Sequence, residues 1–206
     1  MTDESPYGEQ AWDERYRGSQ HAWSGNPNAV LVAEISDLPP GTALDAGAGE
    51  GGDACWLAAR GWRVTGVDIS SVALERAAAQ AKERGLEVSW VHLDLSRDEA
   101  PGTYDLVSSH FVHLPLDRRP TLFAHLAAAV APGGTLLVVG HDPSDAESGV
   151  ARPHLEEAAW TPDEVVGALG PGWQVEVAEA RPRRARHQDG PEVTVHDAVV
   201  RARRHH

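Results

Sequence analysis

The sequence predicts an α/β protein in which one mostly parallel sheet is covered by helices on both faces. Short apolar runs alternate with alanine-rich helical stretches from residue 42 onward. Their spacing is that of right-handed βαβ crossovers, which build parallel sheets. The chain then ends in two alternating segments joined by a short connection, which is typical of an antiparallel pair. We therefore expect one doubly wound sheet of seven strands that finishes in a C-terminal antiparallel hairpin.

The first three strands are predicted by apolar or alternating segments at residues 42–49, 62–70 and 86–95. The first of them runs directly into a glycine loop. Helices are expected between these strands, over 53–60 and 71–84, because both stretches are rich in alanine. We expect Ser71 to cap the second helix and Gly85 to end it in the left-handed conformation.

Four further strands are expected at residues 103–111, 135–141, 173–182 and 192–203. A helix over about 117–131 lies between the first two of them and closes at Pro132-Gly133-Gly134. Thr161-Pro162-Asp163-Glu164 begins another helix, with a threonine cap, a proline at the first helical position and a glutamate three residues after the cap. That helix is expected to end near Gly170.

Two stretches lie outside the regular pattern and are candidates for lids. Residues 141–160 form a polar connection that is longer than compact domains usually contain without a purpose. Residues 7–30 hold four of the ten Trp and Tyr side chains: Tyr7, Trp12, Tyr16 and Trp23. We expect residues 1–40 to form an N-terminal lid with helices, and residues 41–206 to form the core of a single domain.

Composition and charge exclude several classes of protein. The 206 residues include one cysteine, Cys55, so an internal disulfide is impossible and a cytoplasmic location is expected. No apolar run reaches the ~18 residues that a bilayer span needs, and the polar, acidic start lacks the pattern of a secretory signal. The formal net charge is −13, and the arginines of residues 181–206 leave the rest of the chain still more negative. A nucleic-acid partner is therefore disfavoured, and no membrane partner is expected.

A glycine loop, DAGAGEGG, follows the first predicted strand and opens the first helix. Its Gly47, Gly49 and Gly52 satisfy the pattern G-x-G-x-x-G, which by itself is weak evidence for a dinucleotide site. Glycine is needed in such a loop for positive backbone angles and for close approach of the backbone to a ligand. Asp68 ends the next strand, where a carboxylate accepts hydrogen bonds from the hydroxyls of an adenosine ribose.

The charge of this loop separates two classes of ligand. A nicotinamide dinucleotide would place its pyrophosphate over the loop, where Asp45 and Glu50 would repel it. A ligand with an α-ammonium group and a sulfonium would be attracted by the same carboxylates. Asp94 ends the third strand, so Asp45, Asp68 and Asp94 all fall in the crevice where open α/β sheets bind ligands. Any one of them taken alone also fits an ordinary turn residue.

Five segments resemble successive motifs of the class I S-adenosylmethionine-dependent methyltransferases: DAGAGEGG, GVDIS, HLDL, YDLVSSHFVHLP and VAPGGTLLVV. The resemblance is close over about residues 40–141 and extends in outline to residue 203. The N-terminal WDERYRGSQHAWSGNP also resembles the small-molecule branch that includes thiopurine, thiol and halide methyltransferases and proteins linked to tellurite resistance. The resemblance implies a Rossmann-like fold, S-adenosyl-L-methionine as cofactor and S-adenosyl-L-homocysteine as product.

The resemblance also implies roles for the residues of the glycine loop. The backbone of Gly47 and Gly49 would pass along the methionine part of the cofactor, and Asp45 would hold its ammonium group. Ala48 stands where many relatives carry cysteine, a change between two small residues. Asp68 would bind the ribose hydroxyls.

The remaining cofactor contacts follow from the same resemblance. Ile69 would pack on the adenine, Asp94 would accept from its amino group, and the amide of Leu95 would meet a ring nitrogen. His110 would line the pocket floor beneath the sulfonium. Three aromatic residues would form a lid over cofactor and substrate, although core packing of an N-terminal helix also explains them: Trp12, Tyr16 and Trp23.

Methyl transfer from a sulfonium is an in-line displacement, so alignment of the nucleophile and exclusion of water supply much of the rate. A soft sulfur, selenium or tellurium acceptor needs little help from a base and is slightly favoured. A hydroxyl or amine acceptor usually needs its proton removed, and three histidines at or just beyond strand ends suit that work: His110, His113 and His141. Each of them also fits a role in shaping the pocket.

Several alternatives stay open at this point. The nearest is an O- or N-methyltransferase of a specialised metabolite with a histidine base. More distant ones are a nicotinamide-dependent oxidoreductase and a cofactor-binding protein without catalysis. No metal is expected, because scattered histidines without a cysteine cluster are not a metal signature. The expected partner is a small-molecule methyl acceptor, and a monomer or a homodimer is expected.

Overall fold

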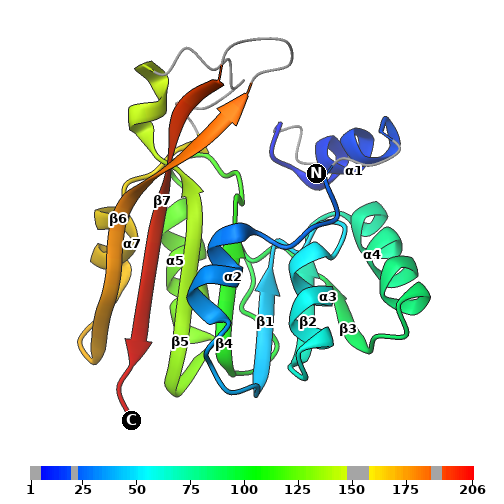
Figure 1. Ribbon diagram of the computed structural model, residues 1–206, viewed down its shortest axis with the longest axis horizontal. Coiled ribbons are helices and arrows are strands. Elements are labelled where there is room, and N and C mark those ends of the chain that lie inside the picture. Colours follow the sequence, from blue (N-terminus) through cyan, green and yellow to red (C-terminus); the bar gives the residue numbers. More distant parts are fainter. Residues whose placement is uncertain (1–5, 20–22, 148–157, 187–191) are drawn as a thin grey trace.

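The computed structural model describes residues 6–19, 23–147, 158–186 and 192–206. Its strands are β1 Thr42–Ala46, β2 Arg63–Asp68, β3 Val88–His92, β4 Tyr104–His110, β5 Val130–His141, β6 Trp173–Arg186 and β7 Glu192–Arg204. They form one seven-stranded sheet in the order β3-β2-β1-β4-β5-β7-β6 (Figure 1). The first five strands in this order are parallel, and β7 runs antiparallel to both of its neighbours. The predicted doubly wound sheet with a C-terminal antiparallel hairpin is confirmed.

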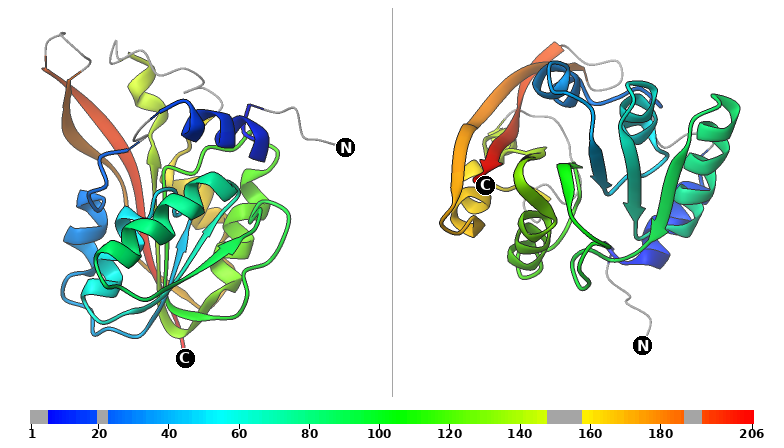
Figure 2. Two further views of the ribbon diagram at one scale, coloured as in Figure 1. Left: turned by 90° about the vertical axis from the view of Figure 1, so that its right-hand side faces the viewer. Right: turned by 90° about the horizontal axis from the view of Figure 1, so that it is seen from below.

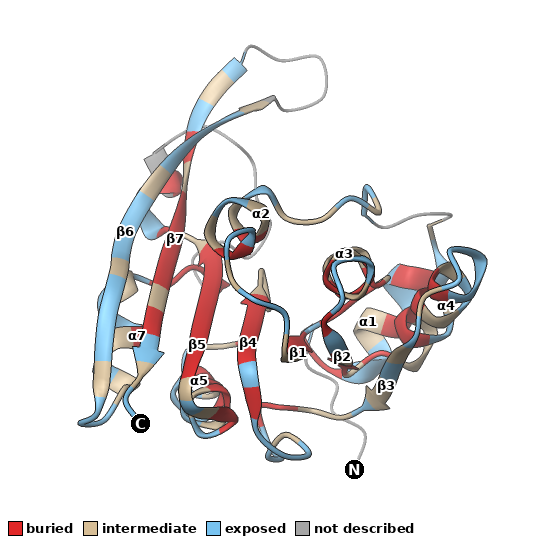
Figure 3. Cartoon of the chain, turned by 60° about the horizontal axis from the view of Figure 1, so that its bottom comes forward, coloured by how far each residue is buried: buried red, intermediate tan, exposed pale blue. Residues whose placement is uncertain are grey.

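The helices are α1 Glu9–Arg17, α2 Ala29–Ile35, α3 Gly52–Ala59, α4 Ser71–Glu83, α5 Arg119–Ala128, the 3-10 helix η1 Pro143–Glu147, and α7 Pro162–Ala168. Two apolar cores lie on the two faces of the sheet (Figure 3). Leu31 of α2 and Leu57 of α3 are fully buried in one core, and Leu126 of α5 and Val165 of α7 in the other. Among the described residues, no helix is long and apolar enough to cross a bilayer.

Two local predictions are wrong. The cap of α4 is Ser70, whose Oγ accepts a hydrogen bond from the Ala73 N–H at 3.1 Å. Ser70 has the extended backbone that a cap requires, whereas the predicted cap, Ser71, is already the first helical residue. The start of the fifth strand is also wrong: α5 ends at Ala128, and β5 begins at Val130 rather than at residue 135, while its end at His141 is as predicted. A register shift after the pairing of Val130 with Tyr104 accommodates the Pro-Gly-Gly segment within the strand.

Other local signals are confirmed. Gly85 has a φ of +65° immediately after α4. Thr161 and Glu164 form the predicted capping box at the start of α7. In each case a residue type with a strong local preference decides the backbone conformation without help from distant contacts.

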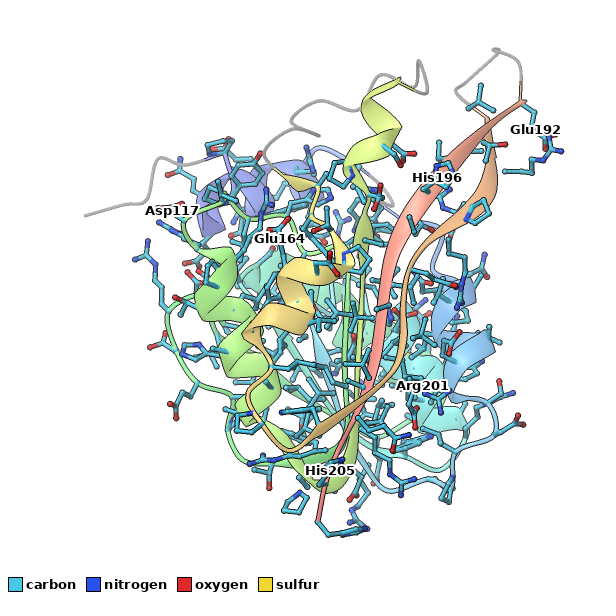
Figure 4. The ribbon with its side chains drawn as sticks, turned by 90° about the vertical axis from the view of Figure 1, so that its left-hand side faces the viewer. Asp117, Glu164, Glu192, His196, Arg201 and His205 are labelled. Atoms are coloured by element: carbon cyan, nitrogen blue, oxygen red, sulfur yellow. The ribbon has the colours of Figure 1, made fainter. Side chains whose placement is uncertain are left out.

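β6 runs to Arg186, four residues beyond its predicted end at residue 182, whereas β7 begins at Glu192 as predicted. β7 pairs with β5 only from Asp197 onward, where Asp197 lies opposite His141, the last residue of β5. Figure 4 shows Glu192 and His196 in the upper part of β7, and Arg201 and His205 toward the opposite end. The hairpin therefore extends beyond the carboxyl ends of the parallel strands, which is where the site lies.

Candidate cofactor and acceptor site

A cavity of about 810 Å³ lies at the carboxyl ends of the parallel strands. Figure 2 shows α1 lying across this end of the sheet. Every residue that the sequence assigned to cofactor binding or catalysis lines the cavity: Trp12, Tyr16, Trp23, Asp45, Gly47, Ala48, Gly49, Asp68, Ile69, Asp94, Leu95, His110, His113 and His141. Those in or just after the strands meet because the parallel strands all have their carboxyl ends on the same side of the fold. The aromatic residues of this set come from α1 and from the segment between α1 and α2.

The glycine loop between β1 and α3 brings bare backbone against this cavity. Gly47 and Gly49 have φ values of +80° and +52°, a region that L side chains rarely adopt. A Cβ at Gly47 would collide with the Val112 side chain, and one at Gly49 would lie 3.0 Å from the Tyr16 hydroxyl. The loop thus needs glycine both for its backbone angles and for the close approach of the residues that face it.

Asp68 is a buried carboxylate at the end of β2, and it is held by backbone donors. Its Oδ2 accepts the Gly49 N–H and its Oδ1 accepts the Ser70 N–H, both at 2.8 Å. Burial raises the pKa of Asp68, while these two hydrogen bonds oppose the rise. Asp94 has a different setting: its Oδ1 accepts from both the N–H and the hydroxyl of Ser96, and its Oδ2 lies 3.2 Å from Arg97.

Asp53, which the sequence did not single out, forms a group with the predicted site residues Asp45 and His110. The Oδ2 of Asp53, in the first turn of α3, lies 2.7 Å from the Nδ1 of His110, and Asp53 Oδ1 accepts the Asn28 N–H at 2.6 Å. Asp45 lies close by, and the three side chains Asp45, Asp53 and His110 offer atoms within 4.8 Å of one another. These residues come together only because β1, α3 and β4 pack against one another, so their spacing in the sequence does not predict the group.

The Asp45 carboxyl is buried beside a second carboxyl group, that of Asp53. Burial, followed by the nearby charge of Asp53, raises the pKa of Asp45 well above the usual value. In the part of the chain that the structure describes, Asp45 Oδ2 and His110 Nε2 are buried atoms without a hydrogen-bond partner. A buried carboxyl next to a second carboxylate favours a cationic group in the cavity. An α-ammonium group fits that requirement.

Polar contacts join the aromatic residues Tyr16 and Trp23, candidates for a lid, to the glycine loop. The Trp23 Nε1–H donates to the Tyr16 hydroxyl at 3.0 Å, and the Trp23 N–H donates to Glu50 at 3.1 Å. Arg76 of α4 donates to the other oxygen of Glu50 at 2.8 Å and to the carbonyls of Tyr16 and Ser19. Burial, followed by the charge of Asp68, raises the pKa of Tyr16, so its hydroxyl stays protonated. Arg76 was not foreseen, since its role depends wholly on tertiary contact.

Asp13 joins helix α1 to the start of α4. Its Oδ1 accepts the Ser70 hydroxyl at 2.6 Å and the Val72 N–H at 3.4 Å, and Arg17 lies 2.8 Å from its Oδ2. A carboxylate here also faces the positive end of the α4 dipole. Burial opposes ionisation of Asp13, but the hydrogen bonds from Ser70, Val72 and Arg17 outweigh it, and its pKa is lowered.

We expect Asp13→Ala to lower the free energy of unfolding by about 1–2 kcal/mol, the usual cost of losing a helix cap. Because the pKa of Asp13 in the folded state lies below the usual 3.8, its contribution is present above pH 3.8 and disappears as pH falls through the lowered value. Urea unfolding at pH 7 and near pH 3 tests this. An equal loss at both pH values would contradict the assignment to the ionised carboxylate.

Aromatic and imidazole rings line the other end of the cavity. Trp12 lies 6.0 Å from His113, His113 lies 5.3 Å from His141, and His141 lies 4.7 Å from Phe111, measured between ring centroids. Phe111 has a φ of +52°, which is a strained conformation for a residue with a side chain. Its N–H donates to the Val139 carbonyl at 2.8 Å, which holds the turn that follows β4. This aromatic wall extends the cavity beyond the cofactor end.

The fold and this crevice, with its glycine loop and its carboxylates at successive strand ends, are those of a doubly wound α/β enzyme that binds a nucleoside-containing ligand. Comparison with known proteins makes the class specific. Residues 43–134 match the model of the methyltransferase domain family. The 2-heptyl-1-hydroxyquinolin-4(1H)-one methyltransferase of Mycobacteroides abscessus is 32% identical over 172 residues, which are 74% of this chain and 75% of that protein. The chain belongs to the class I S-adenosylmethionine-dependent methyltransferases, whose cofactor is S-adenosylmethionine.

Other similarities agree with this membership. The trans-aconitate 2-methyltransferase of Rhizobium meliloti is 32% identical over 139 residues, which cover 66% of this chain and 52% of that protein. A solved structure from work on the conversion of a disulfide bond into a thioacetal group during echinomycin biosynthesis has a TM-score of 0.76 at 25% identity, covering 96% of this chain and 91% of that one. TehB from Haemophilus influenzae shares the fold, with a TM-score of 0.74 at 18% identity over 95% of this chain and 66% of that one.

Proposed function

We propose that this methyltransferase acts on a hydroxyl oxygen of a small planar molecule, with His113 or His141 as the base. The observation that carries the proposal is the pair of imidazoles, 5.3 Å apart, in the aromatic wall of the cavity. In the step, an imidazole nitrogen takes the hydroxyl proton while the oxygen bonds to the methyl carbon. The bond between that carbon and the sulfur breaks, which leaves S-adenosylhomocysteine and an imidazolium.

In this proposal the carboxylates that line the cavity would hold the cofactor. Asp45, which has a buried oxygen without a partner among the described residues, would pair with its ammonium group, and Asp68 would accept from its ribose hydroxyls. Ile69, Asp94 and the Leu95 amide would contact its adenine. The lid of Trp12, Tyr16 and Trp23 excludes water, and aromatic faces next to a sulfonium contribute on the order of 1–2 kcal/mol.

His110 is better suited to form part of the pocket floor than to act as the base. Its Nδ1 is held by Asp53 at 2.7 Å, and its ring is buried at the cofactor end of the cavity. His113 and His141 lie instead in the wall that the acceptor would meet. We therefore assign His110 to the pocket floor beneath the sulfonium.

The relatives support an oxygen acceptor on a small molecule. By its name, the Mycobacteroides abscessus enzyme methylates 2-heptyl-1-hydroxyquinolin-4(1H)-one, a planar ring system with a hydroxyl group. This shifts our preference from the soft acceptor that the sequence slightly favoured. A sulfur acceptor is the second candidate, favoured by the structural similarity to the protein studied for conversion of a disulfide into a thioacetal.

The deciding experiment measures S-adenosylhomocysteine release with hydroxyquinolines, catechols, amines, thiols, selenite, tellurite and iodide. We expect turnover of hydroxyl acceptors, and we expect the double variant His113→Gln, His141→Gln to lose about 10²–10⁴-fold in kcat/KM with them. The low-pH limb of the dependence of kcat/KM on pH, where the base becomes protonated, should also disappear in the double variant. His110→Gln is the matched variant, which should weaken cofactor binding and keep that limb. Turnover of thiols alone, with an unchanged pH profile in the double variant, would establish the sulfur alternative.

A further inference from the structure

The charges that line the cavity are divided between its two ends. Carboxylates lie at the cofactor end, on the strand ends β1 to β3 and on the loop and first turn of α3: Asp45, Glu50, Asp53, Asp68 and Asp94. Among the described lining residues, Arg183 alone is an arginine or lysine. It comes from β6, at the opposite edge of the sheet from these carboxylates. A cationic cofactor would occupy the acidic end, as in the proposed function, which leaves Arg183 at the part of the cavity that remains for the acceptor.

Arg183 is held in place through one nitrogen and keeps two others available. Its Nε–H donates to Asp197 Oδ2 at 2.6 Å, and Asp197 is only 3% exposed. The Arg183 side chain is 42% exposed, and its terminal nitrogens make no hydrogen bond to any residue within the described ranges. A guanidinium whose Nε is fixed in this way presents its paired Nη groups as a planar fork.

The strand register places this fork beside the proposed acceptor wall. Asp197, which fixes Arg183, is the register partner of His141 across β5 and β7. Arg183 of β6 lies opposite Val195 of β7, two residues before Asp197 on that strand. This is the part of the hairpin near His196 that extends past the parallel strands (Figure 4). His141 and Arg183 therefore contribute to the same end of the cavity from separate strands.

We propose that Arg183 determines acceptor specificity by binding an anionic oxygen group, such as a carboxylate, on the methyl acceptor. The proposal rests on the proposed function only in placing a small-molecule acceptor in this cavity. A planar carboxylate matches the guanidinium fork with two parallel hydrogen bonds, whereas a neutral amide offers one acceptor oxygen and no charge. With the anionic group on Arg183, the rest of a flat acceptor lies along the wall of Phe111, His113 and His141.

The test compares matched acceptors that differ only in this charge. Binding to the S-adenosylhomocysteine complex is measured by calorimetry for 3,4-dihydroxybenzoate against 3,4-dihydroxybenzamide, and for 4-mercaptobenzoate against 4-mercaptobenzamide. We expect the protein to bind each carboxylate about tenfold more tightly than its amide, and Arg183→Gln to remove that preference. Arg183→Lys keeps the positive charge but lacks the planar pair of Nη groups, so this variant should retain part of the preference for the carboxylate.

Arg181→Gln is the matched control. Arg181 is on the same strand and pairs with Glu34 and Glu179 at 2.7 Å, but it does not line the cavity. This variant should keep the full carboxylate preference. Equal affinity of the unaltered protein for carboxylate and amide in both pairs would overturn the proposal, as would an equal weakening of both by Arg183→Gln. A preserved preference without methylation of the hydroxyl pair would instead count against the proposed oxygen acceptor and leave the role of Arg183 standing.

Discussion

Asp68→Ala is expected to weaken S-adenosylhomocysteine binding by at least about tenfold, equivalent to about 1.4 kcal/mol or more. The carboxylate at the end of β2 lines the cavity and is fixed there by the Gly49 and Ser70 N–H groups. In the proposed function its loss removes the acceptor for the ribose hydroxyls, and it also leaves a buried Gly49 N–H without this partner. Calorimetric titration with S-adenosylhomocysteine measures the change.

Asp105→Ala is the matched control for Asp68. Asp105 is also held by hydrogen bonds, since it accepts from the backbone N–H and the hydroxyl of Thr42, both at 2.8 Å. Thr42 is the first residue of β1, so this pair lies at the amino end of the strand, opposite to the end where the cavity lies. We expect this variant to change stability and to leave cofactor affinity as it was. An unchanged affinity in Asp68→Ala would contradict the ribose assignment, and an equal loss in both variants would point to a general effect on folding.

Deleting residues 1–25 is expected to lower turnover by about 10²-fold or more, because the proposed function assigns Trp12, Tyr16 and Trp23 to a lid that aligns the reactants and excludes water. The truncated chain should still fold, since the sheet and both apolar cores are built from residues beyond the deleted segment. The deletion also removes Asp13 from the start of α4, so some stability is lost with it. Methyl transfer and thermal unfolding are measured on the same preparation.

Arg76→Ala tests whether the proposed lid must be held in position, and not merely be present, for turnover. This variant keeps every aromatic ring but breaks the contacts from α4 to Glu50 and to the carbonyls of Tyr16 and Ser19. We expect Arg76→Ala to lose most of the turnover that the deletion of residues 1–25 loses, with little change in the free energy of unfolding. Arg84→Ala, just after the same helix, is the control on that element. Full activity in the truncated chain would remove the lid from the mechanism.

Local preferences explain why so much of the fold was predictable. Gly47 and Gly49 have the positive φ that the loop pattern demands, and the capping box at Thr161 begins a helix as predicted. The prediction failed where two local signals compete. Ser70 and Ser71 are both good cap residues, and the end of β2 at Asp68 decided between them. A register shift beside β4 likewise turned Pro132-Gly133-Gly134 into part of a strand.

The sequence by itself determined the doubly wound sheet and the set of residues that meet at its edge, because parallel strands bring their carboxyl ends together whatever the side chains are. Only the tertiary structure decided which side chains contact those residues and how burial shifts their pKa values. Asp53 on His110, Arg76 on the lid and Asp197 on Arg183 each join segments far apart in the chain. Such pairings, and the pKa shifts that burial causes at Asp45 and Asp68, depend on distances and on exclusion of water that no local pattern of residues records.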